Sequence, residues 1–349
     1  MKILIIKPSS LGDVVQALPV LKCLRKKYPG ARIDWLVNEE LGDILLDNPY
    51  LNTVHLWDRA GWRKPRRFFG AVRKAAALVH KLRRTRYEFV FDLQGLFRSG
   101  LIAFLSGGRS VIGFAEAREM APMFYSTKVA ARAREMHSVE RYILAVGAGL
   151  SDEKEFPIGI SRDVEQRTEG LLLRMGYDAT RPFVVLVPGG RWRTKRWPVE
   201  NFASLAEMLA RGEGAQVGLV GLSAERKVSG SIVSRSGWRA MDFSGKTTLR
   251  QLAWLMKKAD AVVGNDSGPI HLAAAVGTPV VGLYGPTSPA RTGPYGVQHT
   301  VVTSRLPCSP CFRRDCEISV ACMREISVDI VYEACKRYIA AGKKPIAPS

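Results

Sequence analysis

Short apolar runs of four or five residues alternate along this chain with longer segments whose apolar residues recur at helical spacing. Runs of that length, rich in Val, Ile and Leu, predict buried strands, and the segments between them predict helices that cover a sheet. Strands that alternate with helices imply right-handed crossovers and a mainly parallel sheet. The pattern therefore predicts an α/β protein.

The alternation occurs in two series. The first predicts strands at residues 3–7, 33–37, 53–57, 89–93 and 110–114, and helices at 14–27, 68–84 and 97–105. The second predicts strands at 183–187, 216–220, 261–264 and 280–284, and helices at 199–210, 224–234 and 248–257. Two doubly wound sheets have a natural binding site in the cleft between them, at the carboxyl ends of their strands.

The pattern weakens after residue 150, and a helix predicted at 163–175 is followed by a turn-rich segment. We place the domain boundary here, which gives a first domain of residues 1–160 and a second of 161–349. A chain of 349 residues exceeds the size at which a single core stops growing, so two domains are expected. The last predicted helix, 328–341, has no strand after it, and packing back onto the first domain is one arrangement open to it.

Three strand-to-helix turns carry polar residues suited to phosphate or proton chemistry. The first holds Gly12 and Asp13, where a dehydrogenase would place G-x-G-x-x-G. Asp13 has two interpretations, a catalytic base at the mouth of a cleft or a carboxylate that complements the helix dipole. The turn at 188–198 combines two glycines with Arg191, Arg193, Lys195 and Arg196, which fits either a diphosphate or a solvated basic loop.

The strongest motif is the turn at residues 264–275. Pro269 stands near the first position of a predicted helix, so the free N–H groups around Ser267 and Gly268 form an anion site at a helix N-terminus. His271 lies one turn further on. Glu225, which follows the second strand of this domain, is placed to accept ribose hydroxyls.

Four cysteines, Cys308, Cys311, Cys316 and Cys322, follow the spacing C-x₂-C-x₄-C-x₅-C. Tetrahedral zinc is one interpretation, with the metal structural rather than catalytic, although a zinc ribbon has two C-x₂-C pairs. Buried reduced thiols and a structural staple are the others. We expect no catalytic metal.

The charge balance is 52 Lys and Arg against 32 Asp and Glu, a net charge of +20. Such a surface attracts polyanions, which include nucleic acid, anionic lipid and phosphorylated substrates. No apolar stretch reaches the roughly 18 residues that a membrane span requires, and the apolar part of the N-terminus is too short for a secretory signal. We expect a cytoplasmic location.

Four short motifs, taken in order, resemble those of the lipopolysaccharide heptosyltransferases, glycosyltransferase family 9. They lie at residues 9–13, 195–198, 265–271 and 284–287. Stretches at 34–37, 92–96, 117–125 and 137–141 are more similar to the heptosyltransferase I members of that family. The resemblance implies the GT-B fold, two Rossmann-like doubly wound parallel-sheet domains facing a cleft. It also implies an inverting transfer of heptose from ADP-L-glycero-β-D-manno-heptose to the Kdo of Kdo-lipid A, with no cofactor and no metal.

By match to the family motifs, Asp13 is the base and Lys195 stabilises the leaving diphosphate. Together with the motifs above, the resemblance assigns the donor site to Gly12, Gly189, Gly190, Lys195, Glu225, Thr247, Asp266, Ser267, Gly268 and His271. For the acceptor site, the stretches similar to heptosyltransferase I supply Arg118 and Arg141. The basic loop after the third strand adds Arg59, Arg63 and Lys64, for which a solvated basic surface is the alternative interpretation. The implied partners are a lipid-linked acidic saccharide and the anionic inner face of the inner membrane, where the protein would be peripheral, and no specific nucleic acid.

Three alternatives stay open at this point. Another family 9 transferase, such as heptosyltransferase II, would use a different acceptor. A nucleic-acid-binding protein is suggested by the charge of +20 alone, without any recognised nucleic-acid motif. A nicotinamide dehydrogenase lacks the glycine fingerprint, although Asp34 near the end of the second strand fits a ribose-binding acid.

Overall fold

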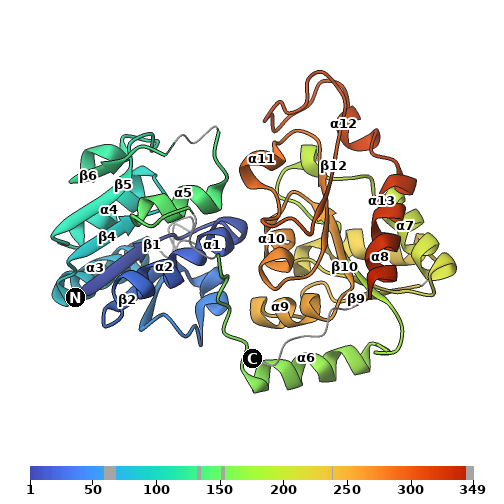
Figure 1. The fold of residues 1–349 in the computed structure, drawn as a ribbon, viewed down its shortest axis with the longest axis horizontal. Helices are drawn as coiled ribbons and strands as arrows, with labels where there is room; N and C mark the ends of the chain where they lie inside the picture. The colour runs from blue at the N-terminus through green and yellow to red at the C-terminus, as the bar shows by residue number, and fades with distance from the viewer. Residues whose placement is uncertain (59–67, 132–134, 151–153, 238, 343–349) are drawn as a thin grey trace. The chain divides into compact units, whose positions relative to one another are not determined.

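The computed structural model describes residues 1–58, 68–131, 135–150, 154–237 and 239–342 (Figure 1). The chain divides into two compact units, Met1–Gly159 and Ile160–Ser349. The division lies one residue from the boundary placed between residues 160 and 161. Each unit has its own sheet and its own core and is described separately.

Unit 1 contains a six-stranded parallel sheet with the order β3-β2-β1-β4-β5-β6. The strands are β1 (Lys2–Ile6), β2 (Arg32–Asn38), β3 (Thr53–Trp57), β4 (Phe89–Asp92), β5 (Ser110–Phe114) and β6 (Thr127–Val129). The central strand β1 is apolar along its length, and Ile3–Ile6 have no exposed surface, because helices cover both faces of a doubly wound sheet.

The helices of unit 1 are α1 (Leu11–Ala17), α2 (Pro19–Lys27), α3 (Phe68–Thr85), α4 (Phe97–Leu105) and α5 (Ser138–Ala145), with 3₁₀ turns η1 (Glu39–Leu45) and η4 (Ala121–Phe124). The single helix predicted at 14–27 is wrong. The structure divides it at Leu18, because Pro19 has no N–H to donate and instead starts α2 at its first position.

Unit 2 repeats the same topology, with the order β12-β11-β10-β7-β8-β9 and every pair parallel. Its strands are β7 (Phe183–Val187), β8 (Gln216–Leu219), β9 (Ala240–Asp242), β10 (Ala261–Asn265), β11 (Val280–Tyr284) and β12 (Thr300–Thr303). Its helices are α6 (Arg162–Arg174), α7 (Val199–Gly212), α8 (Arg226–Arg235), α9 (Leu249–Lys257), α10 (Gly268–Ala275), α11 (Pro289–Thr292), α12 (Ala321–Arg324) and α13 (Val328–Ala341), with 3₁₀ turns η5 (Arg193–Lys195) and η6 (Ser223–Glu225).

The strand order of each sheet reverses at one point, between β1 and β4 in unit 1 and between β7 and β10 in unit 2. Ligands of doubly wound proteins bind at this point, outside the carboxyl ends of the strands. The turns with the predicted catalytic and phosphate-binding residues follow β1, β7 and β10. The topology therefore confirms the predicted α/β, doubly wound class and brings the motifs of each unit to one edge of its sheet.

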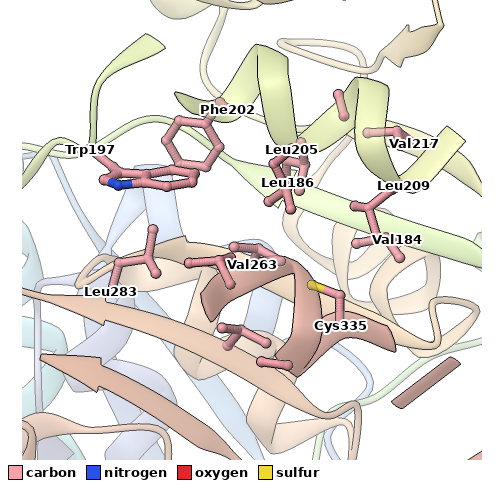
Figure 2. Packing of buried hydrophobic residues seen from close by; sticks show 14 of the residues in the cluster. Val184, Leu186, Trp197, Phe202, Leu205, Leu209, Val217, Val263, Leu283 and Cys335 are labelled. Carbon is pink, nitrogen blue, oxygen red and sulfur yellow. The ribbon is translucent and has the colours of Figure 1, made fainter. Parts of the chain in front are cut away.

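A large apolar cluster holds unit 2 together, and Figure 2 shows its central side chains. Trp197 and Phe202 meet edge to face, with ring centroids 4.9 Å apart, above the β7–β10 part of the sheet. The last helix, α13, buries Val331, Ala334 and Cys335 in this same cluster, against α7 and the sheet of unit 2. The apolar face of α13 is therefore used within unit 2.

The sequence pattern missed β6, β9 and β12. All three are edge strands of three or four residues, and most of their side chains are partly exposed. An edge strand contacts one neighbour and buries little apolar surface, so it lacks the apolar run that reveals a central strand.

In the part of the chain that the structure describes, no helix has both the length and the apolar character needed to cross a membrane.

Asp34 lies inside the sheet of unit 1 with no exposed surface, and it has three partners. The Arg32 guanidinium is 3.0 Å away, the Tyr87 hydroxyl donates at 2.7 Å, and His55 Nε2 lies at 3.5 Å. Burial alone would raise the pKa of Asp34, but hydrogen bonds from His55, Arg32 and Tyr87 lower it. A carboxylate enclosed in this way is not available to a ribose, which removes the one feature that favoured a dehydrogenase.

We expect Asp34→Asn to lower the free energy of unfolding at pH 7 by about 3 kcal/mol, because the buried carboxylate accepts charge-assisted hydrogen bonds from Tyr87 and Arg32 that an amide cannot replace in full. Because folding lowers the pKa of Asp34, the ionised carboxylate stabilises the folded state above the pKa of the unfolded chain, near 3.8. This stabilisation is lost as the pH falls through and below that pKa. The difference between wild type and variant should therefore shrink below about pH 4, as measured by urea unfolding at several pH values. Asp163→Asn is the control, because Asp163 forms an exposed pair with Arg167 and should cost less than about 0.5 kcal/mol. An equal loss at pH 7 and pH 3 would contradict this account of Asp34.

Candidate functional site

The carboxyl edge of the sheet in unit 2 carries a charged cluster around Asp266. The Lys195 ammonium lies 2.6 Å from Asp266 Oδ2, the Thr287 hydroxyl donates to the same oxygen at 2.7 Å, and His271 Nε2 lies 3.7 Å from Oδ1. Asp266 is 7 % exposed and His271 6 % exposed. Residues from three separate turns, after β7, β10 and β11, therefore meet at one carboxylate.

The charge of Asp266 is stabilised by this cluster. Burial opposes ionisation, but the hydrogen bond with His271 and the charge of Lys195 hold the pKa of Asp266 well below its usual range. Asp266 is therefore an anion that orients the cationic Lys195. An ionised Asp266 is better suited to orienting its loop than to contacting a phosphate, because the two negative charges would repel each other.

Asn265, the last residue of β10, connects the same turns through its amide. Its Oδ1 accepts from the Trp197 backbone N–H at 3.0 Å, and its Nδ2 donates to the carbonyls of Pro188 at 2.9 Å and Gly189 at 3.2 Å. The side chain has no exposed surface. One buried amide thus fixes both ends of the turn that carries Lys195.

The N-terminus of α10 offers unpaired hydrogen-bond donors. Ser267 is the N-cap residue, its side chain makes no capping bond, and its Oγ is buried without a hydrogen-bond partner among the described residues. The first N–H groups of a helix lack partners within the helix, and together with its dipole they attract anions. Ser267 and Gly268 lie beside the Asp266 cluster in sequence, so an anion bound here would also approach Lys195.

Glu225 and Gly189 are also close together, as the predicted donor site requires. A Cβ atom on Gly189 would stand 2.3 Å from Glu225 Oε1, so only glycine leaves the carboxylate in its present place. Gly190 is buried next to it. Thr247 lies directly before the N-cap of α9, and no hydrogen bond among the described residues joins it to Asp266.

The cysteine segment lies beside this site. The Thr194 hydroxyl donates to the Arg313 carbonyl at 3.0 Å, and the Phe312 N–H donates to the Pro286 carbonyl at 2.7 Å. All four cysteines of the C-x₂-C-x₄-C-x₅-C motif are free thiols, from the exposed Cys308 to the buried Cys322. Among the described residues, no three His, Cys, Asp or Glu side chains are arranged to hold a metal.

In unit 1, Asp13 lies in the first turn of α1 after buried Gly12. The Ser10 N–H and hydroxyl donate to Oδ2 at 2.9 and 2.7 Å. On the other oxygen, the Tyr142 hydroxyl lies 3.5 Å and the Lys7 ammonium 4.0 Å from Oδ1. The side chain of Asp13 is 38 % exposed, so solvent and substrate can reach it.

Two of the acceptor residues predicted from the sequence lie in the described part of unit 1. Arg118 is exposed after β5, whereas Arg141 on α5 stacks 4.6 Å above the centroid of the Phe114 ring. Arg59, Arg63 and Lys64 lie outside the residues that the structure describes.

Sequence reasoning missed four residues of these sites: Lys7, Tyr142, Asn265 and Thr287. Asn265 and Thr287 lie inside motifs that the sequence analysis recognised. For Asn265 and Lys7, the available signal was a polar residue at the end of an apolar strand. Tyr142 offered none, because only the packing of α5 on α1 brings it to Asp13.

Two Rossmann-like units, each with its polar turns at the point where the strand order reverses, are the architecture of the GT-B class of glycosyltransferases. The chain matches glycosyltransferase family 9 (heptosyltransferase) over residues 75–321. It belongs to that family.

Relatives of both heptosyltransferase types are similar to this chain. Lipopolysaccharide heptosyltransferase 1 of Pseudomonas aeruginosa is 31% identical over 326 residues, which cover 90% of this chain and 87% of that protein. Lipopolysaccharide heptosyltransferase 2 of Salmonella typhimurium is 31% identical over 320 residues, 86% and 88% of the two chains.

Solved structures give the same result. The Escherichia coli ADP-heptose heptosyltransferase II has a TM-score of 0.80 at 25% identity and covers 98% of this chain and 99% of its own. The Escherichia coli heptosyltransferase WaaC with ADP has a TM-score of 0.77 at 25% identity, with 97% and 100% covered. These likenesses confirm the GT-B fold and the family predicted from the motifs.

We expect Lys195→Ala to raise the Michaelis constant for the nucleotide donor and to lower kcat, with kcat/KM falling about a hundredfold. A cation next to a diphosphate contributes in the ground state and more strongly in the transition state. Lys258→Ala is a matched control, because Lys258 also pairs with a carboxylate, Glu169 at 3.0 Å, and also lies over an indole ring, that of Trp254. Steady-state kinetics check both variants. Wild-type donor kinetics in Lys195→Ala would assign the turn after β7 to structure alone.

Proposed function

We propose that this protein transfers heptose from ADP-L-glycero-β-D-manno-heptose to the Kdo of the lipopolysaccharide inner core, on Kdo-lipid A, with inversion at the anomeric carbon. The observation that carries the proposal is the joint presence of Lys195, the α10 N-terminus and the unpartnered Ser267 hydroxyl at one edge of unit 2. Together they offer a cation and several hydrogen-bond donors to a diphosphate. The likeness to WaaC, solved with ADP, supports the same nucleotide.

The donor is assigned to unit 2. Lys195, the N–H groups of Ser267 and Gly268, and His271 stabilise the negative charge that develops on departing ADP. Asp266 holds Lys195 in position and does not touch the phosphates. Glu225, which lies against Gly189, accepts the ribose hydroxyls, and Thr247 contacts the adenine.

The acceptor is assigned to unit 1, where Asp13 is the base. As the acceptor hydroxyl attacks the anomeric carbon, its O–H proton passes to the Asp13 carboxylate and the bond from the anomeric carbon to ADP breaks. Positive charge builds on the sugar at the same time, as in glycoside hydrolysis. Because Lys195 and the helix N-terminus supply the positive charge that the leaving group requires, the proposed mechanism assigns no step to a metal ion.

Basic residues recognise the acidic acceptor in this proposal. Arg118 and Arg141 meet its carboxylates or phosphates, and Arg59, Arg63 and Lys64 supply further charge from outside the described residues. A protein with a net charge of +20 is attracted to an anionic membrane surface, which fits a peripheral position at the inner face of the inner membrane.

A second candidate is transfer onto a heptose that is already present, the reaction of a heptosyltransferase II. The Salmonella relative of that type and the Pseudomonas relative of the first type are equally identical to this chain, at 31%. Mass spectrometry of the product after incubation with ADP-heptose and either Kdo-lipid A or heptosyl-Kdo-lipid A separates the two. A product with one added heptose from Kdo-lipid A supports the first proposal, and a product only from the heptosylated acceptor supports the second.

We expect Asp13→Asn to fold and bind ADP but to lose most of its turnover, because an amide cannot accept the proton of the acceptor hydroxyl. Its Tm should fall somewhat, since Lys7 is buried beside Asp13 and loses a nearby negative charge. Calorimetry with ADP and single-turnover kinetics check the prediction. A variant with a near wild-type rate would remove Asp13 as the base.

A further inference from the structure

Large apolar side chains gather on the surface of unit 1, where α4 packs against η4. Phe104 of α4 is 59 % exposed, and Met120 and Met123 at η4 are 70 % and 64 % exposed. The Phe124 ring joins them, with its centroid 5.3 Å from that of Phe97 and 6.1 Å from that of Phe104. We call these five residues the α4–η4 patch. Single exposed apolar side chains are ordinary, but a contiguous group of them marks an interaction site.

Close packing of α4 on η4 builds this patch. A Cβ atom on Gly100 would stand 2.9 Å from Phe124 Cδ2 and 3.2 Å from the Ala121 carbonyl oxygen, so a larger residue there would push the two elements apart. The inner side of Phe124 packs against the apolar core of unit 1. Met120 has a φ of 59°, in the left-handed region that long side chains seldom adopt. The patch is therefore part of the folded framework of unit 1.

Basic residues border the α4–η4 patch. Arg98, the second residue of α4, and Arg118, two positions before η4 begins to turn, are both exposed. Arg83 of α3 lies against Gly107, just beyond the end of α4, where an added Cβ atom would stand 3.4 Å from Arg83 Cγ. The sequence of α3 has five exposed basic residues and no acidic one. An apolar surface with a cationic border is complementary to a bilayer of anionic phospholipid.

The acidic residues of the same stretch have hydrogen-bond partners within unit 1. Glu119 accepts from the Phe97 N–H at 3.3 Å, at the positive end of the α4 dipole, and Glu116 accepts from the Ala131 N–H at 3.1 Å. From residue 97 to 129 the chain has four basic and two acidic residues. The excess of positive charge around the patch therefore remains.

The patch begins beside the turn that carries Asp13. Phe97 starts α4 at the end of the turn after β4, and Gln94 Oε1 in that turn accepts from the Ser9 N–H in the turn after β1, at 3.1 Å. Both turns lie at the carboxyl edge of one sheet. Since α4 has nine residues and is about 14 Å long, the whole patch lies near this edge.

We propose that the α4–η4 patch is the surface with which unit 1 docks on a bilayer of anionic phospholipid. Its aromatic and methionine side chains enter the interface between head groups and acyl chains, while the bordering arginines contact the phosphates. The inference rests on the proposed function in one respect, since an acceptor held in the membrane explains why the patch lies beside the Asp13 turn.

A second copy of the chain is a less suitable occupant. In a symmetric dimer each copy would present the same patch to the other, which brings the arginine borders of the two copies together. Like charges at that distance repel each other, whereas an anionic lipid surface attracts them.

The test is a triple variant, Phe104→Gln with Met120→Asn and Met123→Gln, assayed by sedimentation with lipid vesicles. Asparagine is chosen at position 120 because it tolerates the left-handed region. We expect wild type to bind phosphatidylglycerol vesicles more tightly than phosphatidylcholine vesicles, with an affinity that falls as salt is added. The triple variant should bind phosphatidylglycerol vesicles at least about thirtyfold more weakly, because three apolar side chains no longer enter the interface.

The matched control also replaces three exposed apolar residues, but in unit 2. It combines Leu173→Gln, Val297→Gln and Ile330→Gln, and it should bind the vesicles like wild type. Equal binding by wild type and the patch variant, or equal losses in the patch variant and the control, would overturn the inference.

Two further measurements keep the test decisive. If the triple variant has a lowered Tm or no longer binds ADP, the single variants Phe104→Gln and Met123→Gln replace it, each with an expected loss of vesicle affinity of about threefold to tenfold. Sedimentation velocity tests the other occupant. A wild-type dimer that is lost in the patch variant, together with no binding to vesicles, would assign the patch to self-association and overturn membrane docking.

Activity on two forms of the acceptor separates this inference from the proposed function. With Kdo-lipid A in phosphatidylglycerol vesicles, kcat/KM of the patch variant should fall about as much as its vesicle affinity. With a short-chain Kdo acceptor in solution it should equal the wild-type value. If wild type makes no product from either acceptor, the proposed function fails, and the vesicle assay still decides the inference. If product forms and the patch variant binds vesicles like wild type, only the docking role fails.

Discussion

The charged cluster of unit 2 depends on one buried carboxylate. Asp266 fixes a lysine from the turn after β7 and a threonine from the turn after β11, and it lies near His271 of α10. Its neighbour Asn265 holds the backbone of the β7 turn. Because a buried charge must be paired, these turns cannot move independently without leaving Asp266 or Lys195 uncompensated. The Lys195 ammonium is thus held in place by contacts within the protein itself.

Unit 1 places its own carboxylate in a different environment. Asp13 is more exposed than Asp266, and the cation beside it, Lys7, lies inside the unit rather than at its surface. Asp266 meets its lysine at 2.6 Å, whereas Asp13 has its lysine at 4.0 Å and keeps one oxygen without a short hydrogen bond from Ser10. The first arrangement suits a group that orients its partner.

The topology explains why one chain carries a carboxylate–lysine pair in each unit. Both sheets have the same strand order, and in both the polar turns follow the strands that flank its reversal. The segment with four cysteines adds to this on unit 2, where its backbone bonds to Thr194 and Pro286. Through these bonds the segment supports the turns that carry Lys195 and Thr287.

The sequence by itself determined the α/β class, the central strands and the family, because buried parallel strands leave apolar runs and the turns after them leave short motifs. It placed Asp13, Lys195, Asp266 and His271 in those turns. Only the tertiary structure decided the edge strands β6, β9 and β12, the break at Pro19, and the enclosure of Asp34 among Arg32, His55 and Tyr87. It also decided that Lys7 and Tyr142, 135 positions apart in the sequence, meet at Asp13. Such contacts depend on how helices pack across a sheet, and local periodicity carries no information about which distant side chains that packing brings together.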